Sequence, residues 1–316
     1  MTKEHAHCLV LGGRGFIGSH LVDALLAQGH RVRCFYRPSP DDAPACDNPA
    51  LEYFEGDLTD EARVGQALEG IDVCFHLIST TLPQSSNADP AYDVRSNVLG
   101  TVSLLTQAVS QGVKRVVFVS SGGTVYGIPS VSPIPETHAT DPVCSYGITK
   151  LAIEKYLGLF RHLHGLECTV LRIANPFGER QRMRSGQGAV AVFLGKVLRG
   201  EPIEVWGDGS VVRDYIYIGD VIDSLLAAMH YSGPEYVFNI GSGRGHSINE
   251  VLQAVENVTG RPATRHYLPG RAFDVPSNVL CIERAGQLLG WAPKVGFEDG
   301  LQRFADWVNQ SPDRYT

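Results

Sequence analysis

Residues 11–18 read LGGRGFIG and lie between a short apolar run and a segment with helical spacing. They place Gly12, Gly15 and Gly18 at intervals of three. Glycine in such a turn permits a sharp bend, lets a phosphate approach the backbone, and lets the next helix pack closely on the preceding strand. The unpaired amide groups at the start of that helix attract an anion. The stretch therefore predicts a strand–turn–helix unit that can bind a dinucleotide.

Apolar runs and amphipathic segments alternate through the N-terminal half of the chain. This order predicts a parallel sheet with helices on both faces, so the expected fold class is α/β with a doubly wound sheet. The expected strands are 7–13, 31–36, 51–57, 72–78, 114–121 and 167–175, and the expected helices are 16–30, 60–70, 92–112 and 145–165.

The alternating pattern loosens after about residue 176, which indicates a change in organisation. We expect a dinucleotide-binding domain at 1–175 and a smaller, mainly substrate-binding portion at 176–316. Segments at about 213–240 are expected to return to the first domain.

The composition narrows the class of protein. The chain has 316 residues, of which 43% are hydrophobic and 19% charged, as in an ordinary soluble globular protein. A formal net charge of −7 without runs of Lys and Arg argues against a nucleic-acid surface. Without a signal peptide or membrane-spanning stretch, the chain is expected in the cytoplasm. Seven scattered cysteines and eleven histidines without ligand spacing predict free thiols and no metal site.

The end of the second expected strand departs from the usual NAD pattern. An acidic residue is expected there to bind the ribose hydroxyls, but the chain has Tyr36 and Arg37. Arg37 could hold a 2′-phosphate, stack on the adenine, or be a solvated surface charge, so NAD and NADP both remain open. Asp57, at the end of the third strand, is placed to contact the adenine edge.

Tyr146 and Lys150, in SYGITK, are one helical turn apart and therefore share a face. A nearby ammonium and a positive nicotinamide ring would favour the phenolate, which lets a tyrosine act as a base nearer neutral pH. The hydroxyl-rich strand end SSGGTVYG, residues 120–127, precedes the pair. Together with the glycine loop, this arrangement predicts a dehydrogenase-type site.

These elements resemble the extended short-chain dehydrogenase/reductase family, and within it the nucleotide-sugar 4-epimerases. The resemblance covers essentially the whole chain and is strongest to UDP-N-acetylglucosamine 4-epimerases of Pel exopolysaccharide biosynthesis. It rests on GGRGFIGSHL, GDL, FHL, NVLGT, SSGGTVYG, SYGITK, LRIANPFGERQ, GDGSVVRDYIYIGDV, NIGSGRGHSINEV and PGRAFDVPSNVL. It implies a Rossmann-like fold and a bound NAD. The implied cofactor contacts are Gly12, Gly15, Phe16, Ile17, Gly18, Tyr36, Arg37, Asp57, Leu58, Leu77, Asn97, Tyr146 and Lys150.

The family places a Ser or Thr beside the tyrosine, where it hydrogen-bonds the sugar 4-hydroxyl. In this chain that position is Gly122, and the resemblance leaves Ser121 as the first candidate for the relay and Thr124 as the second. A site without a side-chain relay is the third alternative. Dehydratase relatives carry an Asp-Glu pair where this chain has Gly123 and Thr124, and decarboxylase relatives carry a Glu at the second position. Both reactions are therefore disfavoured.

The resemblance also implies the sugar-nucleotide contacts. Arg213 and Arg271 would clamp the diphosphate, because guanidinium groups match phosphate oxygens. A small Asn278, where relatives restricted to plain hexoses have tyrosine, leaves room for an acetamido group. The implied substrate contacts are Ser121, Tyr146, Asn175, Ala189, Val190, Trp206, Arg213, Arg271, Asp274 and Asn278. The helices 90–111 and 146–164, which pair in family dimers, suggest a homodimer.

The expected activity is a UDP-N-acetylglucosamine 4-epimerase that interconverts UDP-GlcNAc and UDP-GalNAc, with UDP-Glc and UDP-Gal as further substrates to test. Tyr146 would take the 4-hydroxyl proton while carbon 4 is oxidised to a ketone and then reduced from its other face. The product would supply polysaccharide synthesis. Two alternatives remain: an NADPH-dependent 4-ketosugar reductase, motivated by Arg37, and a non-catalytic sugar-nucleotide sensor, motivated by Gly122.

Overall fold

The computed structural model describes residues 5–38, 47–83, 85–184, 188–270 and 275–310. The chain divides into two compact units, which we treat separately. The first unit contains residues 1–125, 142–172 and 224–238, and the second contains 126–141, 173–223 and 239–316. The predicted domain division at residue 175 stays a prediction.

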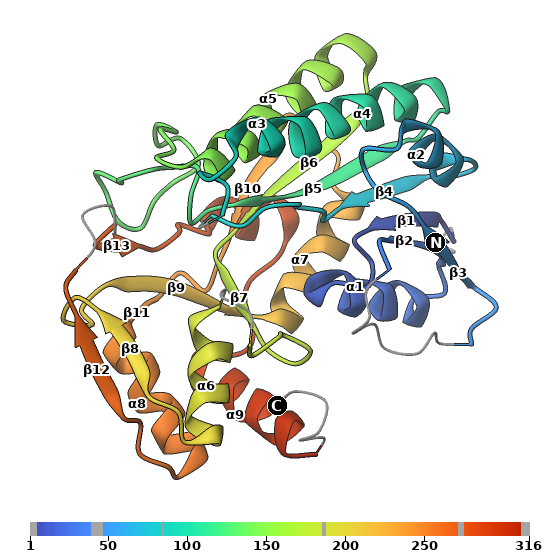
Figure 1. The fold of residues 1–316 in the computed structure, drawn as a ribbon. Helices are drawn as coiled ribbons and strands as arrows, with labels where there is room; N and C mark the ends of the chain where they lie inside the picture. Colours follow the sequence, from blue (N-terminus) through green and yellow to red (C-terminus); the bar gives the residue numbers. More distant parts are fainter. Residues whose placement is uncertain (1–4, 39–46, 84, 185–187, 271–274, 311–316) are drawn as a thin grey trace. The chain divides into compact units, whose positions relative to one another are not determined.

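The first unit is built on a seven-stranded sheet in the order β10-β6-β5-β4-β1-β2-β3. All six strands expected in the N-terminal half are present, and β10 adds a seventh at one edge (Figure 1). The strands are β1 (His7–Leu11), β2 (Arg31–Tyr36), β3 (Leu51–Glu55), β4 (Val73–His76), β5 (Arg115–Ser121), β6 (Glu167–Ile173) and β10 (Val237–Ile240). Because β1 to β5 pair in parallel, their carboxyl ends share one edge of the sheet.

Helices cover both faces of this sheet, as Figure 1 shows. Helices α2 (Glu61–Leu68), α4 (Gly100–Ser110) and α5 (Ser145–His164) lie on one face, and α1 (Phe16–Ala27) lies on the other. On the α4 face, apolar side chains such as Leu104, Leu105 and Leu157 pack against Val116 and Phe118 of β5. The predicted α/β class with a doubly wound sheet is confirmed.

The expected helix at 92–112 is not continuous. The chain forms α3 (Pro90–Asp93), then a π-helical segment η1 (Val94–Leu99), and only then α4. The side-chain amide of Asn97 donates to the backbone oxygen of Asp93 at 3.1 Å and to its carboxylate at 2.8 Å. These bonds compete with the regular backbone pattern and account for the widened turn.

A buried ion pair joins α5 to β6. Glu154 and Arg172 have side chains that are 2% and 5% exposed, and their closest atoms are 2.6 Å apart. The Ser120 hydroxyl also donates to Glu154, at 2.5 Å. Removing one member of such a pair leaves the other charge buried and typically costs about 3–5 kcal/mol. The pair therefore holds the middle of α5 on the sheet.

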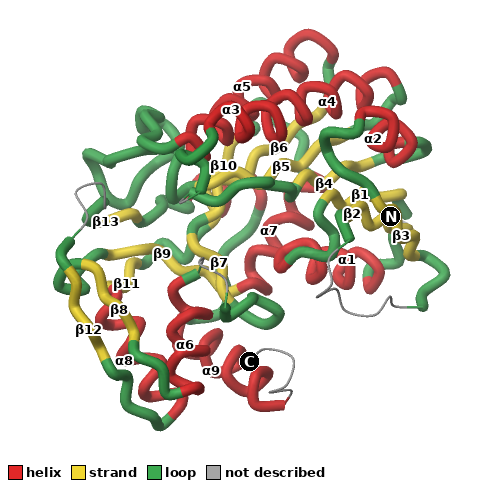
Figure 2. The backbone as a smooth tube through the Cα atoms, in the orientation of Figure 1, coloured by secondary structure: helices red, strands yellow, loops and turns green. Residues whose placement is uncertain are grey.

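The second unit contains short strands around β9, and helices that pack on one another (Figure 2). Strand β9 (Val212–Tyr217) pairs with β7 (Asn175–Phe177), β11 (Gly245–Ser247) and β13 (Ser277–Asn278). Strands β8 (Ile203–Trp206) and β12 (Arg265–Leu268) form a separate parallel pair. The other helices of this unit are α6 (Ala189–Arg199), α8 (Ile248–Thr259), η2 (Ala285–Leu289) and α9 (Phe297–Gln310). Helix α7 (Ile218–His230) begins in the second unit and continues into the first, which contains residues 224–238.

A buried carboxylate fastens the loops of the second unit to β9. Asp214 is fully buried and accepts hydrogen bonds from the backbone amides of Ser242 at 2.8 Å and Leu280 at 3.2 Å. The Ser242 hydroxyl donates to the same carboxylate at 2.7 Å. Asp214 thereby fastens two segments to β9: the one that precedes β11 and the one that follows β13.

Candidate active site

The direction of the strand order reverses between β1 and β4. At such a switch point, the loops after the two strands diverge and leave a crevice at their carboxyl ends. In the first unit those loops begin with Gly12 after β1 and Leu77 after β4. They are close together, because a side chain added to Gly12 would lie 3.4 Å from Ile78. This is the position at which open parallel sheets bind nucleotides.

The glycine loop fits a pyrophosphate. Gly12 has φ +83°, a conformation that L side chains rarely adopt, and a Cβ on Gly18 would lie only 2.1 Å from the Gly12 oxygen. Helix α1 begins after Gly15 without a side-chain cap and without an acidic residue in its first turn. Its positive end is therefore open to an anion. The residues present fit a dinucleotide.

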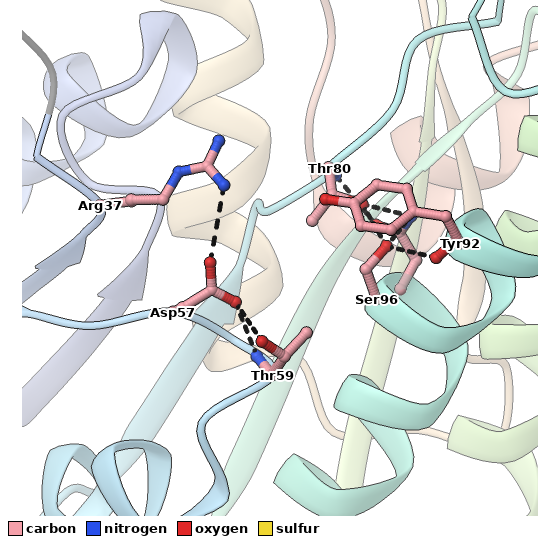
Figure 3. A network of polar contacts seen from close by, with 7 residues as sticks. Arg37, Asp57, Thr59, Thr80, Tyr92 and Ser96 are labelled. Atoms are coloured by element: carbon pink, nitrogen blue, oxygen red, sulfur yellow. Dashed lines mark hydrogen bonds and ion pairs between the residues drawn. The ribbon is translucent and has the colours of Figure 1, made fainter. Parts of the chain in front are cut away.

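Charged groups meet at the ends of β2 and β3 (Figure 3). The Arg37 guanidinium lies 3.6 Å from the Asp57 carboxylate, which also accepts bonds from the amide and hydroxyl of Thr59. Burial acts to raise the pKa of Asp57. The hydrogen bonds from Thr59 and the charge of Arg37 outweigh it and lower this pKa below its ordinary value. Arg14 stacks over the Tyr36 ring, 4.8 Å from its centroid. A 2′-phosphate would have to compete with Asp57 for Arg37.

The other predicted cofactor contacts surround the same crevice of the first unit. Phe16 and Ile17 form the first turn of α1, and Leu77 donates its amide to the Leu11 oxygen at 3.1 Å. Leu58 is buried against Gly100. Asn97 is 5% exposed, and its amide oxygen accepts the Thr80 amide at 3.0 Å. Their contacts with the cofactor stay predictions.

Tyr146 and Lys150 lie in the first two turns of α5, and residues distant in sequence hold this helix end. Its N-cap residue, Cys144, makes no side-chain cap. Instead, Asn87 accepts the Ser145 amide at 2.9 Å, and the Ser86 hydroxyl accepts the Tyr146 amide at 3.0 Å. No local pattern in the sequence predicts these two caps, because they come from a loop about 60 residues earlier.

Burial dominates the electrostatics of the pair. Lys150 is 4% exposed and donates to the Val119 oxygen at 2.9 Å. Burial lowers the pKa of Lys150 to about 8, against the opposing charges of Glu154 and Asp93. Burial likewise raises the pKa of Tyr146 to about 12, while a hydrogen bond from Ser79 acts to lower it. Within the protein's own groups the pKa of the phenol is therefore raised, whereas the sequence predicted that the ammonium would lower it.

Two hydroxyl groups were predicted as relay candidates for the Tyr146–Lys150 pair, and the structure adds a third hydroxyl beside Tyr146. Ser121 ends β5 and is half-buried, while the Thr124 hydroxyl is buried without a hydrogen-bond partner among the described residues. Their backbones are linked, since the Thr124 amide donates to the Ser121 oxygen at 3.3 Å. Ser79, which the sequence did not single out, contacts the Tyr146 phenol. The choice between Ser121 and Thr124 as relay stays a prediction.

In the second unit, β9 brings three predicted substrate residues together. Asn278 pairs directly with Arg213 across β13 and β9, and Asn175 pairs with Tyr215 across β7 and β9. Asn278 is 1% exposed. Arg213 donates to the backbone oxygens of Val212 and Val275, at 2.8 and 2.6 Å. The side-chain amide of Asn175 donates to the backbone oxygen of Asp214 at 2.9 Å.

The remaining predicted substrate residues have different surroundings. Trp206 ends β8 and is 39% exposed, and Ala189 begins α6. Val190 is 1% exposed within the apolar core of the second unit, so only its backbone is left to meet a ligand. Arg271 and Asp274 lie outside the described residues.

The described residues contain neither a helix that could cross a membrane nor a cluster of metal-ligand side chains. No helix in this part of the chain has the length and hydropathy needed to cross a membrane. Nor do three or more His, Cys, Asp or Glu side chains gather there in a way that would hold a metal ion.

Comparisons with known proteins identify the family. Residues 8–241 match the NAD dependent epimerase/dehydratase family, to which the chain therefore belongs. The UDP-glucose 4-epimerase of Mycolicibacterium smegmatis is 36% identical over 304 residues, across 95% of this chain and 97% of that protein.

Two solved structures resemble the chain along its length. The UDP-glucose 4-epimerase of Thermotoga maritima with UDP-glucose has a TM-score of 0.92 at 37% identity, covering 97% of this chain and all of that one. The UDP-N-acetylglucosamine 4-epimerase of Methanobrevibacter ruminantium in complex with UDP-N-acetylmuramic acid has a TM-score of 0.90 at 28% identity, covering 97% and 99%.

These matches confirm the predicted family resemblance and the Rossmann-like fold. The predicted class of enzyme, an NAD-dependent nucleotide-sugar 4-epimerase, is confirmed as well. The particular hexose, the homodimer and the link to Pel exopolysaccharide stay predictions.

Replacing Gly18 with alanine tests the fit of the glycine loop. The added Cβ would approach the Gly12 oxygen to 2.1 Å, so the turn must shift. We expect NAD affinity, measured by titration calorimetry on nucleotide-free protein, to fall at least about tenfold, or roughly 1.4 kcal/mol. Gly286→Ala is the control, because its Cβ meets its nearest atom at 3.8 Å. Native affinity in Gly18→Ala would contradict the assignment.

Proposed function

We propose that the protein is a UDP-N-acetylglucosamine 4-epimerase that interconverts UDP-GlcNAc and UDP-GalNAc in the cytoplasm. The observation that carries the proposal is the placement of Tyr146 and Lys150 on one face of α5, in the unit that contains the glycine loop. The absence of carboxylates at Gly123 and Thr124 favours epimerisation over dehydration. Supply of UDP-GalNAc to exopolysaccharide synthesis is part of the proposal and rests on the resemblance alone.

Tyr146 is the proposed base. Its phenolate would take the proton of the sugar 4-hydroxyl, directly or through the Ser121 hydroxyl, and would return a proton after the sugar has turned. When bound, NAD supplies the hydride acceptor for carbon 4 and later the hydride donor. Lys150 would remain an ammonium that stabilises the phenolate and holds the nicotinamide ribose. No cofactor is consumed, because the reaction is redox-neutral.

The second unit would hold the nucleotide while the sugar turns. Arg213 and Arg271 are the proposed diphosphate contacts, with Asn175 beside them and Asp274 on the uridine ribose. Rotation of the 4-ketosugar about the diphosphate link would then present its opposite face. The contacts of Arg213 and Asn175 with backbone oxygens support this role, because a side chain held in place loses less entropy on binding.

Asn278 is the proposed determinant of the N-acetylated sugar. It is buried beside Arg213, so its size limits the space next to the diphosphate clamp. An asparagine is smaller than a tyrosine and can hydrogen-bond an acetamido group. One pocket residue of this kind typically discriminates by about 1–3 kcal/mol.

The central test is turnover of UDP-GlcNAc by the purified protein without added cofactor, followed by proton NMR of the anomeric signals. We expect UDP-GalNAc to appear, and Tyr146→Phe to reduce the rate at least about 100-fold, because the general base is lost. Tyr156→Phe, on the same helix and 38% exposed, is the matched control and should retain turnover. Net consumption of added NADPH would instead favour the ketosugar reductase, and no chemistry at all would favour the sensor.

Asn278→Tyr tests the choice of sugar. We expect kcat/KM for UDP-GlcNAc to fall at least about tenfold relative to that for UDP-glucose, because the larger ring occupies the space of the acetamido group. Parallel NMR assays with both substrates measure the ratio, and Asn278→Ser is the size control. An unchanged ratio in Asn278→Tyr would exclude Asn278 as the determinant.

We also propose that the protein is a homodimer. Apolar side chains of α5 lie exposed to solvent, with Ile148 54%, Leu159 44% and Leu163 61% exposed. Leu99 at the end of η1 is 57% exposed. Exposed apolar groups on adjacent helices of one unit favour contact with a second copy.

Light scattering should give a mass twice the 34.3 kDa of the chain. Introducing charges with Leu159→Glu and Leu163→Glu should yield monomers, because a carboxylate is costly to bury. Leu288→Glu, at an exposed leucine of η2, should leave the mass unchanged. A monomeric native protein would refute the homodimer.

A further inference from the structure

Asp93 is a fully buried carboxylate at the end of α3, directly before the π-helical turn. Its Oδ1 accepts the Thr81 hydroxyl at 2.6 Å and the Asn97 amide at 2.8 Å. Its Oδ2 accepts the Ser145 hydroxyl at 2.7 Å. Both oxygens act as acceptors from neutral donors, which is the pattern of an ionised carboxylate. These contacts leave its charge without a cationic hydrogen-bond partner.

The same carboxylate contacts the turn of α5 that carries the catalytic pair. Ser145 immediately precedes Tyr146, and Thr149, whose hydroxyl is 3.4 Å from Asp93 Oδ2, immediately precedes Lys150. The Thr149 hydroxyl also donates to the backbone oxygen of Tyr146 at 2.9 Å. Asp93 therefore touches the neighbours of both residues.

The segments around Asp93 are tied to one another, so its position is well defined. Thr80, in the loop after β4, shares a 2.6 Å hydrogen bond with Ser96 of η1, as Figure 3 shows. The Ser96 hydroxyl also donates to the Tyr92 oxygen at 2.7 Å. Thr81 of the same loop donates to Asp93 itself. The π-helical turn, the loop and the start of α5 thus meet at one carboxylate.

Asp93 differs from the other ionisable groups near Lys150 in how its charge is balanced. Glu154, on the same helix, is bound to the Arg172 guanidinium, which balances its charge. His76 of β4 is buried, and burial together with the charge of Lys150 lowers its pKa to about 3, so it is neutral near pH 7. The remaining group is the phenol of Tyr146. Among the described residues, Asp93 is thus the buried carboxylate near Lys150 that no guanidinium balances.

We propose that Asp93 is a positioning residue that seats the first turn of α5 and supplies the counter-charge of the Tyr146–Lys150 pair. Burying a carboxylate that no guanidinium balances is costly. A neutral side chain could accept the same hydrogen bonds without that cost, so the charge itself needs an explanation. A negative charge here favours the protonated form of both partners, and accordingly Asp93 raises the pKa of Lys150 and of Tyr146. Only the effect of Asp93 on the pH profile of turnover rests on the proposed function.

Asp93→Asn removes the charge and keeps the shape and the acceptor for Thr81 and Asn97. Losing a negative charge lowers both macroscopic pKa values of the coupled pair. We expect both limbs of the pH profile of kcat/KM to move toward lower pH by about half a unit to one unit. Asp93→Ser serves the same purpose if the asparagine variant does not fold.

Two controls separate charge from structure. Ser145→Ala removes one hydrogen bond to Asp93 but keeps the charge, so turnover should fall while the limbs stay in place. Asp89→Asn removes an exposed charge four residues away and should leave the profile unchanged, because solvent screens it. A loss of rate in Asp93→Asn without displacement of the limbs would overturn the proposal.

A second readout does not depend on turnover. In protein labelled with ¹³C at the lysine side-chain carbon next to nitrogen, NMR follows the titration of Lys150, which Lys150→Met assigns. We expect the pKa of Lys150 in Asp93→Asn to fall by about half a unit or more. An unchanged titration would refute the counter-charge. A displaced titration in a protein that does not epimerise sugars would support the counter-charge and refute the proposed function.

Discussion

The hydrogen bonds that seat the first turn of α5 are the constraint on which the site depends. The helix begins at Ser145, its N-cap residue Cys144 makes no side-chain cap, and its first amides are satisfied by Ser86 and Asn87. The start of a helix without such partners would carry unsatisfied donors in a buried place. Tyr146 therefore takes its position from tertiary contacts, and the loop after β4 positions the proposed base.

Burial sets the pKa values of the proposed catalytic pair, Tyr146 and Lys150. It moves the pKa of Lys150 down to about 8 and that of Tyr146 up to about 12, so both shifts favour neutral side chains. A base needs the opposite state of the phenol, and nearby positive charge is the way to reach it. Two carboxylates act to raise the pKa of Lys150. They are Glu154, which is balanced by Arg172, and Asp93, which is not. The site thus combines a low-dielectric environment with fixed charges.

Local patterns in the sequence predicted the elements that depend on short-range physics. The strands and the glycine loop follow from apolar periodicity and from the special backbone of Gly12, and the tyrosine–lysine pair follows from helical spacing. Local patterns did not predict the π-helical turn. It arises where the Asn97 side chain donates back to Asp93, and no residue propensity signals such a contact. Val190 stays a predicted substrate contact, and its burial in the core could not be predicted from the family position, because that position does not reveal which way a side chain points. Ser79, Ser86 and Asn87 act across long sequence separations and carry no local signature.

In the proposed mechanism, carbon 4 of the sugar is oxidised briefly and receives the same hydrogen back. UDP-GlcNAc deuterated at carbon 4 tests this most directly, with the product examined by NMR and mass spectrometry after incubation in ordinary water. The account predicts that UDP-GalNAc retains the deuterium at carbon 4, because the hydride never exchanges with solvent. Product that has lost the deuterium to water, or that carries it at another carbon, would contradict it.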